Sequence, residues 1–363
     1  MLSFEKLRSG AIRFEDQPRR GVKVQRRPVV GITMGDPTGI GPEITVKALA
    51  ESDLYAICRP LVIGDAHVMD QAIDVARITA KVNRIGSPSQ ARYRPGSIDV
   101  LDLGNVEGKD LVHGRVDERA GRAAAEYIKR AVDLALSREI EAVVTCPIHK
   151  EAINMAGFHY PGHTEFLAHL TGTQDYAMML VHGDFRIVHC TTHVSLREAC
   201  ELITTERIIQ TIKLANLSLK RLGIEEPRIG VAGLNPHAGE GGLFGTEEIE
   251  QISPAIEEAR KEGILAEGPI PPDTVFAKAR SGLYDVVIAM YHDQGHIALK
   301  SQEFTWNKGQ GCSRIGGVNV TLGLPFARTS VDHGVAFDIA GKGLAVPDSL
   351  VEAIRLAVQL TGP

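Results

Sequence analysis

Residues 285–300 read DVVIAMYHDQGHIALK, and this stretch decides the fold class. Its apolar run at residues 286–290 predicts a buried strand. The polar sequence YHDQG follows where that strand ends, and Lys300 comes about two helical turns later if the next segment is helical. Ligands of open α/β sheets bind at the carboxyl ends of strands. His292, Asp293 and Lys300 are therefore candidate site residues, with a polar turn after a core strand as the equal alternative.

Length and composition indicate a large globular chain. It has 363 residues, of which 44% are hydrophobic and 23% are charged. The net charge is -5 without a long basic block, which argues against nucleic acid and anionic membranes as main partners. No apolar run is long enough to span a bilayer. Five scattered cysteines without a CxxC pair predict a reducing, cytoplasmic location rather than a disulfide framework.

Apolar strands and amphipathic helices alternate along the first half of the chain. Residues 29–34 predict a strand, residues 117–136 a helix and residues 142–146 another buried strand. This βαβ order predicts an α/β fold with a mostly parallel sheet and helices on both faces. The turn GDPTGIGPE at residues 35–43 has neither GxGxxG spacing nor the Lys-Ser/Thr of a P-loop. A tight structural turn and a wall of a ligand cleft remain equally open for it.

Three histidines occur in one context, each after an apolar strand. They are His193, His237 and His292. A parallel sheet can bring such residues together, and three imidazoles suit Zn²⁺ or another borderline divalent metal with positions left for substrate oxygens. One such histidine alone would more often be structural. The rival HDQGH at residues 292–296 has the histidine spacing of HExxH, but its Asp and internal Gly disfavour a hydrolytic zinc site.

Cationic and hydroxyl side chains at loop positions favour an anionic ligand. Lys150, Lys300 and Arg328 are the cations, and His163 and Thr164 are further donors. Such groups suit a phosphate or a carboxylate. Ordinary surface charge is the better interpretation of Lys150 alone.

Seven segments resemble the 4-hydroxythreonine-4-phosphate dehydrogenase (PdxA) family. They are GITMGDPTGIGPEI, PGHTEFLA, TTHVSLREA, LNPHAGEGGLFGTEE, PPDTVF, AMYHDQG and GVNVTLGLPFARTSVDHG. The resemblance implies a two-domain α/β/α fold like that of isocitrate and isopropylmalate dehydrogenases, with mixed sheets and the active site in the interdomain cleft. The expected division is an extension at 1–27, a first domain at 28–140 plus 318–363, and a second domain with dimer contacts at 141–317.

The resemblance also implies cofactors and ligands. It implies NAD at a non-Rossmann site, which agrees with the missing GxGxxG, and a divalent metal (Zn, Mn, Mg or Co). The metal would be held by His193, His237 and His292, shared between the subunits of a homodimer. The substrate contacts that it implies are His163, Thr164, Lys300, Asn319 and Arg328.

The implied reaction is oxidation of the 3-hydroxyl of a phosphorylated four-carbon hydroxy acid by NAD⁺, followed by loss of its carboxylate. Asp293 and Asp273 are candidates for acid–base work, or only for orienting a histidine. Lys300 is a candidate both for catalysis and for holding the phosphate.

Two departures from the biosynthetic enzymes are visible. His296-Ile297 stands where they commonly have a Leu-Pro pair, and the segment between Lys300 and Asn319 is longer. Both resemble a second branch, which oxidises D-threonate or D-erythronate 4-phosphate. A third branch acts on aromatic cis-dihydrodiol carboxylates and lacks the GHTE motif, which this chain keeps. A non-catalytic ligand-binding protein would predict a damaged metal set.

Overall fold

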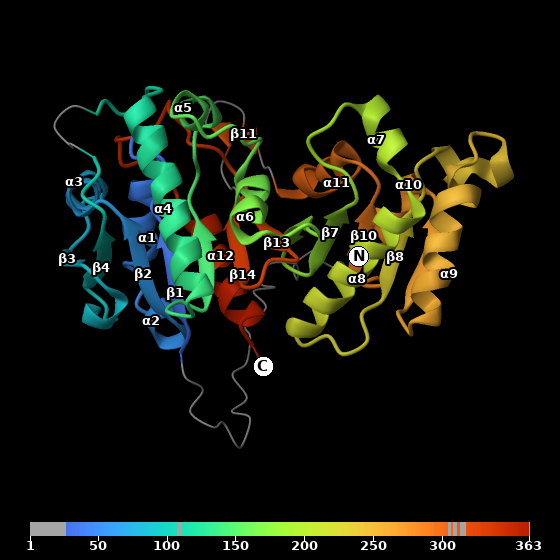
Figure 1. Ribbon diagram of the computed structural model, residues 1–363, viewed down its shortest axis with the longest axis horizontal. Helices are drawn as coiled ribbons and strands as arrows, with labels where there is room; N and C mark the ends of the chain where they lie inside the picture. The colour runs from blue at the N-terminus through green and yellow to red at the C-terminus, as the bar shows by residue number, and fades with distance from the viewer. Residues whose placement is uncertain (1–26, 107–110, 304–305, 308–310, 313–316, 363) are drawn as a thin grey trace, which may run out of the picture.

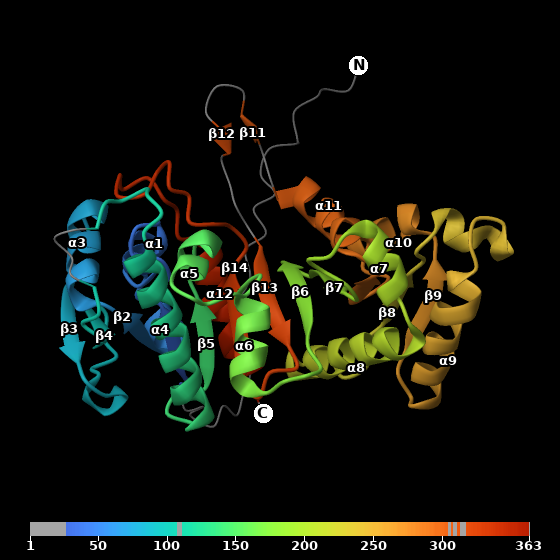
Figure 2. The ribbon, with the colours of Figure 1, turned by 45° about the horizontal axis from the view of Figure 1, so that its top comes forward.

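The computed structural model describes residues 27–106, 111–303, 306–307, 311–312 and 317–362. Within these residues, one mixed sheet of twelve strands runs through the whole molecule, with helices on both faces (Figures 1 and 2). The predicted α/β class is confirmed. In sheet order the strands are β3 (Lys81–Ile85), β4 (Ser97–Asp102), β2 (Arg59–Gly64), β1 (Val29–Thr33), β5 (Ala142–Thr145), β14 (Ala327–Val331), β13 (Val318–Leu322), β6 (Ala177–His182), β7 (Phe185–His189), β10 (Val286–Ala289), β8 (Ile229–Ala232) and β9 (Ala266–Ile270).

The first half of the sheet is parallel from β3 to β14. All five residues of β1 are buried, as expected of a strand that is covered on both faces. Strand β14 comes from the C-terminal part of the chain and lies between β5 and β13. Figure 1 shows it, in red, beside elements from the first half of the sequence. Segments far apart in sequence therefore build one half of the molecule.

The two halves are joined by antiparallel pairing. Strand β13 pairs antiparallel with β14 on one side and with β6 on the other. Its ladder with β6 runs from Val318 opposite Val181 to Leu322 opposite Ala177. The β6–β7 hairpin then leads into the parallel strands β7, β10, β8 and β9. The sheet therefore continues without a break from one half into the other.

Helices form where a capping residue precedes a segment with one apolar face. Helix α4 begins after Asp117, whose carboxylate accepts a hydrogen bond from the Arg119 backbone N–H at 2.8 Å. Its Gly121 packs so closely on α5 that a Cβ atom would lie 2.2 Å from the Ala152 backbone. The α-helices are α1 (Gly41–Ala48), α2 (Leu54–Ile57), α3 (Ala66–Ala76), α4 (Glu118–Leu136), α5 (Lys150–Met155), α6 (His163–Thr171), α7 (Leu196–Leu202), α8 (Thr205–Arg221), α9 (Ser253–Lys261), α10 (Pro272–Arg280), α11 (His292–Glu303) and α12 (Asp348–Leu360).

Short elements complete the fold. Strands β11 (Trp306–Asn307) and β12 (Gly311–Cys312) form an antiparallel pair in the segment between α11 and β13. Figure 2 shows this ribbon at the same end of the molecule as α5, α7 and α11. Residues 304–305, 308–310 and 313–316 of that segment, and the predicted extension before Arg27, lie outside the described residues. The proposed domain boundaries stay a prediction.

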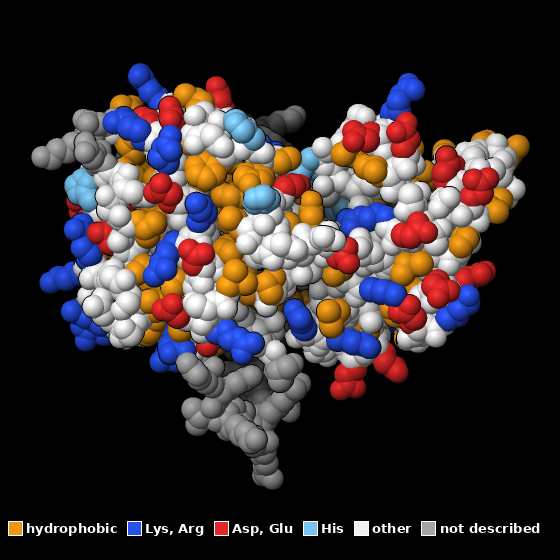
Figure 3. Space-filling model, viewed as in Figure 1, with side chains coloured by type: hydrophobic (Ala, Val, Ile, Leu, Met, Phe, Trp, Pro, Cys, Tyr) orange, Lys and Arg blue, Asp and Glu red, His pale blue; other side chains and the backbone are white. Residues whose placement is uncertain are grey.

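The surface carries charges of both signs. Figure 3 shows acidic and basic side chains scattered over one face rather than collected in one region. Among the described residues, no helix has both the length and the apolar composition needed to cross a membrane.

Candidate active site

A buried arginine forms the centre of the first group of site residues. Arg328 on β14 is 2% exposed. It donates hydrogen bonds to the Thr321 hydroxyl at 2.8 Å and the Thr145 hydroxyl at 2.6 Å. Thr321 is also 3.2 Å from the hydroxyl of Thr164, in the first turn of α6. We call Thr145, His163, Thr164, Thr321 and Arg328 the arginine cluster; it unites three of the predicted substrate contacts.

The arginine cluster is electrostatically unusual because it contains a buried guanidinium. Arg328 makes no ion pair with another described residue. Burial lowers the pKa of Arg328 to about 9, and the negative charge of Glu165 works against this shift. Burial, followed by the charges of Arg328 and Lys150, also lowers the pKa of His163 well below its ordinary value. An anion bound here would offset the cost of burying the guanidinium.

Four histidines gather on β7, on the segment after it, and on α11. His193 and His292 have ring centroids 5.8 Å apart. His296 lies flat on His292, with centroids 3.6 Å apart and planes 11° apart. His189 lies behind them at 4.9 Å from His296. We call these four residues the histidine cluster. Burial lowers the pKa of His189 to about 3 and that of His296 to about 4, and neighbouring histidines add to both shifts.

A carboxylate lies beside the Nδ1 atom of each of two histidines, His193 and His292. Asp293 accepts a hydrogen bond from His292 Nδ1 at 2.7 Å, and Glu165 lies 3.4 Å from His193 Nδ1. Both rings therefore present Nε2 as the nitrogen with an available lone pair. This is the arrangement in which metal-ligating histidines are usually held. Asp293, predicted as an acid–base or orienting residue, lies in the orienting position.

His237 follows β8, next to β10 in the sheet, but its surroundings differ. Its ring is exposed and lies 6.3 Å from that of Phe244. Residues 237–241 all have positive φ values, from 45° to 77°, so His237 stands on a left-handed turn. Buried Glu248 anchors this turn by accepting the backbone N–H groups of Leu234 and Asn235, both at 2.8 Å.

The predicted trio of metal ligands is only partly gathered in one chain. Strands β7, β10 and β8 are adjacent and parallel, so the three histidines do follow the same edge of the sheet. In the described part of the chain, however, no three His, Cys, Asp or Glu side chains form a group that could hold a metal ion. Binding of one metal by all three stays a prediction.

The remaining predicted residues have three different environments. Lys300 Nζ on α11 lies 3.3 Å from an oxygen of Asp332, a carboxyl whose pKa is raised by burial. The amide oxygen of Asn319 is enclosed without a hydrogen bond to a described residue. Asp273 is exposed in the first turn of α10, and its carboxylate bonds to no other described side chain.

Sequence reasoning missed Glu165, which connects the two clusters. It lies one residue after Thr164 on α6, contacts His193 across the junction of the two halves, and acts on Arg328 through its charge. The hydrogen bond to His193 and the charge of that ring help to lower the pKa of Glu165 against the effect of burial. The sequence signal that could have identified Glu165 is its position as the last residue of the GHTE motif.

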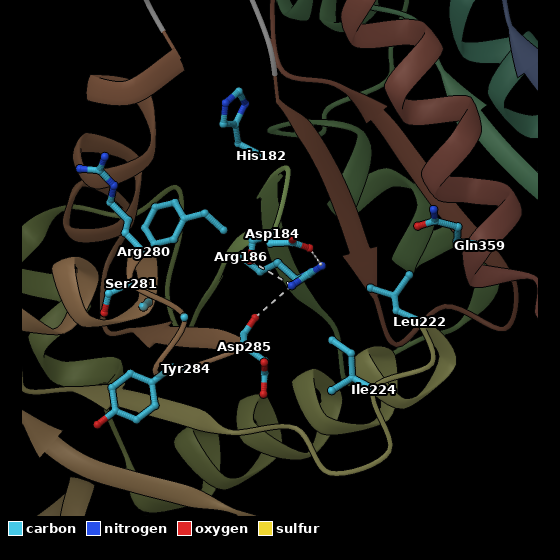
Figure 4. A pocket seen from close by; sticks show the side chains of 13 residues that line it. His182, Asp184, Arg186, Leu222, Ile224, Arg280, Ser281, Tyr284, Asp285 and Gln359 are labelled. Atoms are coloured by element: carbon cyan, nitrogen blue, oxygen red, sulfur yellow. Dashed lines mark hydrogen bonds and ion pairs between the residues drawn. The ribbon is translucent and has the colours of Figure 1, made fainter. Parts of the chain in front are cut away.

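Two cavities differ in their relation to these residues. One of about 260 Å³ is lined by His193, His292, Asp293 and neighbours on α7. The other, of about 930 Å³, is shown in Figure 4 and includes Asp184, Arg186 and Asp285. Because β7 and β10 begin there, it lies at the opposite edge of these strands from the histidine cluster.

Comparisons with known proteins give a consistent result. A family model described as Pyridoxal phosphate biosynthetic protein PdxA matches residues 56–357. The D-threonate 4-phosphate dehydrogenase of Cupriavidus necator is 48% identical over 334 residues, which are 92% of this chain and 97% of the relative. A crystal structure of a 4-hydroxythreonine-4-phosphate dehydrogenase from Burkholderia phymatum is 49% identical, with a TM-score of 0.79, over 92% of this chain and 98% of that one. Its counterpart from Klebsiella pneumoniae is 44% identical, with a TM-score of 0.81, over 92% and 99%.

Proposed function

The chain belongs to the PdxA family, and from this premise we propose that it oxidises the 3-hydroxyl of a phosphorylated four-carbon hydroxy acid with NAD⁺ and that decarboxylation follows. Two substrates fit this description. One is 4-hydroxy-L-threonine 4-phosphate; the two crystal structures carry the name 4-hydroxythreonine-4-phosphate dehydrogenase. The other is D-threonate or D-erythronate 4-phosphate; the Cupriavidus necator relative and the sequence His296-Ile297 support it.

The paired carboxylates of the histidine cluster carry the proposal. His193 and His292 each have Nδ1 beside a carboxylate, at 3.4 Å and 2.7 Å, which fits a divalent metal at Nε2. We propose that these two residues and His237 hold it, with one imidazole supplied across a homodimer. When bound, such a metal supplies a Lewis acid that makes a substrate hydroxyl easier to deprotonate.

The arginine cluster is proposed to bind the phosphate. A buried guanidinium with two fixed hydroxyl partners is rigid, and it needs an anion. The hydroxyl of Thr164 adds a further donor, and His163 stays neutral because burial lowers its pKa. Lys300 and Asn319 would complete the substrate contacts. Asp293 would orient His292 rather than take the substrate proton, whereas Asp273 remains a candidate base.

Exposed apolar side chains support the homodimer. Here such side chains follow each of the three proposed ligands along the chain. They are Leu196 at 62% exposure, Leu243 at 72%, Phe244 at 47% and Ile297 at 68%. The described cysteines are unpaired, including the exposed Cys200, which supports the proposed cytoplasmic location.

The deciding experiment measures NAD⁺ reduction by absorbance. Purified protein receives Zn²⁺, Mn²⁺, Mg²⁺ or Co²⁺ with either the amino substrate or the two sugar-acid 4-phosphates. We expect turnover of one substrate class, complete loss with a chelator, and recovery on adding metal. Absence of NADH with every substrate and metal would overturn the proposed function.

Shared sites can be tested by complementation. H237A and H292A should each be inactive. After the two inactive variants exchange subunits, a dimer containing one of each has one intact site, so the mixture should regain up to about a quarter of wild-type activity. No recovery, in a mixture shown to contain heterodimers, would contradict ligands supplied by two subunits.

A further inference from the structure

Helix α11 carries His292, His296 and Lys300 at successive four-residue steps. These three side chains therefore follow one face of the helix. His296 thus lies between a proposed metal ligand and a proposed substrate contact. It has no role in the mechanism described so far.

The ring of His296 is held tightly against that of His292. The centroids are 3.6 Å apart and the planes differ by 11°, which is a parallel stack. His296 Nδ1 donates a hydrogen bond to the backbone carbonyl of His292 at 3.0 Å. Ring and backbone contacts together leave His296 one orientation relative to its neighbour.

The ring of His189 packs against His296 in the stack. It is fully buried on β7, and its ring lies 4.9 Å from that of His296 at an angle of 39°. Gly295 allows this approach, because a Cβ atom there would lie 2.3 Å from His189 Nε2. The absence of a side chain at Gly295 lets α11 lie against β7, and His296 is enclosed between His189 and His292.

We propose that His296 is a positioning residue for metal binding. Its ring fixes the plane of the His292 imidazole, and the hydrogen bond to Asp293 fixes the rotation of that imidazole within the plane. This inference rests on the proposed function, because it requires His292 to be a ligand. Partners that orient a ligating histidine typically change metal affinity by about 10- to 100-fold.

The test compares Co²⁺ affinity, read by visible absorption, in the metal-free full-length protein without NAD⁺ or substrate. H296L removes the aromatic ring, whereas H296F keeps a ring that can stack. We expect H296L to raise the Kd by about 10- to 100-fold and H296F to stay within about threefold of wild type. H67L, the same substitution at an exposed histidine of α3 outside both clusters, is the matched control and should not change the Kd. Thermal melting shows that each variant is folded.

Each other outcome is decisive. An unchanged Kd for H296L, while H292A abolishes binding, would overturn the role of His296 and leave the proposed function intact. An H296F variant as weak as H296L would overturn positioning through the ring stack. Absence of Co²⁺ binding by the wild type would overturn both the proposed metal site and this inference.

Discussion

The arginine cluster and the histidine cluster are built in opposite ways. Arg328 is 2% exposed, and both of its hydroxyl partners come from the same chain. The side chains of His193 and His292 are 36% and 34% exposed, and His237 stands on a left-handed turn after β8. The proposed anion site is thus preformed within one chain around a buried cation, whereas two of the proposed metal ligands stay partly exposed to solvent.

Removing the buried guanidinium should have the largest effect. R328M deletes two charge-assisted hydrogen bonds and the proposed phosphate contact, so we expect kcat/KM to fall by about 10³-fold. The melting temperature should change little, because the variant also removes the cost of burying an unpaired charge. R328K is the matched control and should recover part of the activity, since its ammonium keeps the positive charge but lacks the planar set of N–H donors of the guanidinium. A loss below tenfold for R328M would contradict the proposed role of Arg328 in binding the phosphate.

Glu165 tests whether the clusters act independently. E165Q keeps the size of the side chain but removes the charge beside Arg328 and weakens the acceptor for His193. We expect about a tenfold weaker metal affinity together with a lowered KM for the phosphorylated substrate, because the Glu165 charge no longer repels the phosphate or competes with it for Arg328. Co²⁺ titration and steady-state kinetics measure the two effects separately. If only one of them changes, Glu165 does not couple the clusters.

The burial of His163 in the arginine cluster predicts that the stability of the protein depends on pH. Because the folded pKa of His163 lies well below its usual value, the unfolded chain takes up a proton near pH 6.5 that the folded chain does not bind. This residue's contribution to stability is therefore fully present above pH 6.5 and is lost as the pH falls. The free energy of unfolding should therefore fall less steeply with falling pH in H163N than in the wild type, by up to about 1.4 kcal/mol per pH unit. Thermal melts of the metal-free protein from pH 7.5 to 5.5 measure this slope, with H67N, which removes an exposed histidine, as the control.

The smallest effect is expected at the large cavity. Asp184 lines it, and its side chain is fully exposed at the opposite edge of the strands from the histidine cluster. D184N should change kcat/KM by less than about twofold, as surface substitutions usually do. A larger change would show that this edge of the sheet communicates with the site.

Much of the fold could be predicted because its signals are local. Runs of buried apolar residues such as 286–290 mark strands, and the position of His292 just after such a strand places it at the end of β10. The contact between Glu165 and His193 could not be predicted from spacing, since it spans the junction of two halves that only tertiary packing brings together. The separate environment of His237 depends on a left-handed turn that Glu248 anchors from 11 residues further along the chain.

The antiparallel join of β13 with β6 has a mechanical consequence. Five residue pairs connect the halves at this ladder, and β13 also pairs with β14. Swinging the halves widely apart would break backbone hydrogen bonds that are shielded from water, each costly to leave unmade. We therefore expect motion between the halves to occur mainly through gradual changes of sheet twist. We therefore expect the spacing between Arg328 and the histidine cluster to change little when a ligand binds, so that this spacing limits the length of substrate that can contact both.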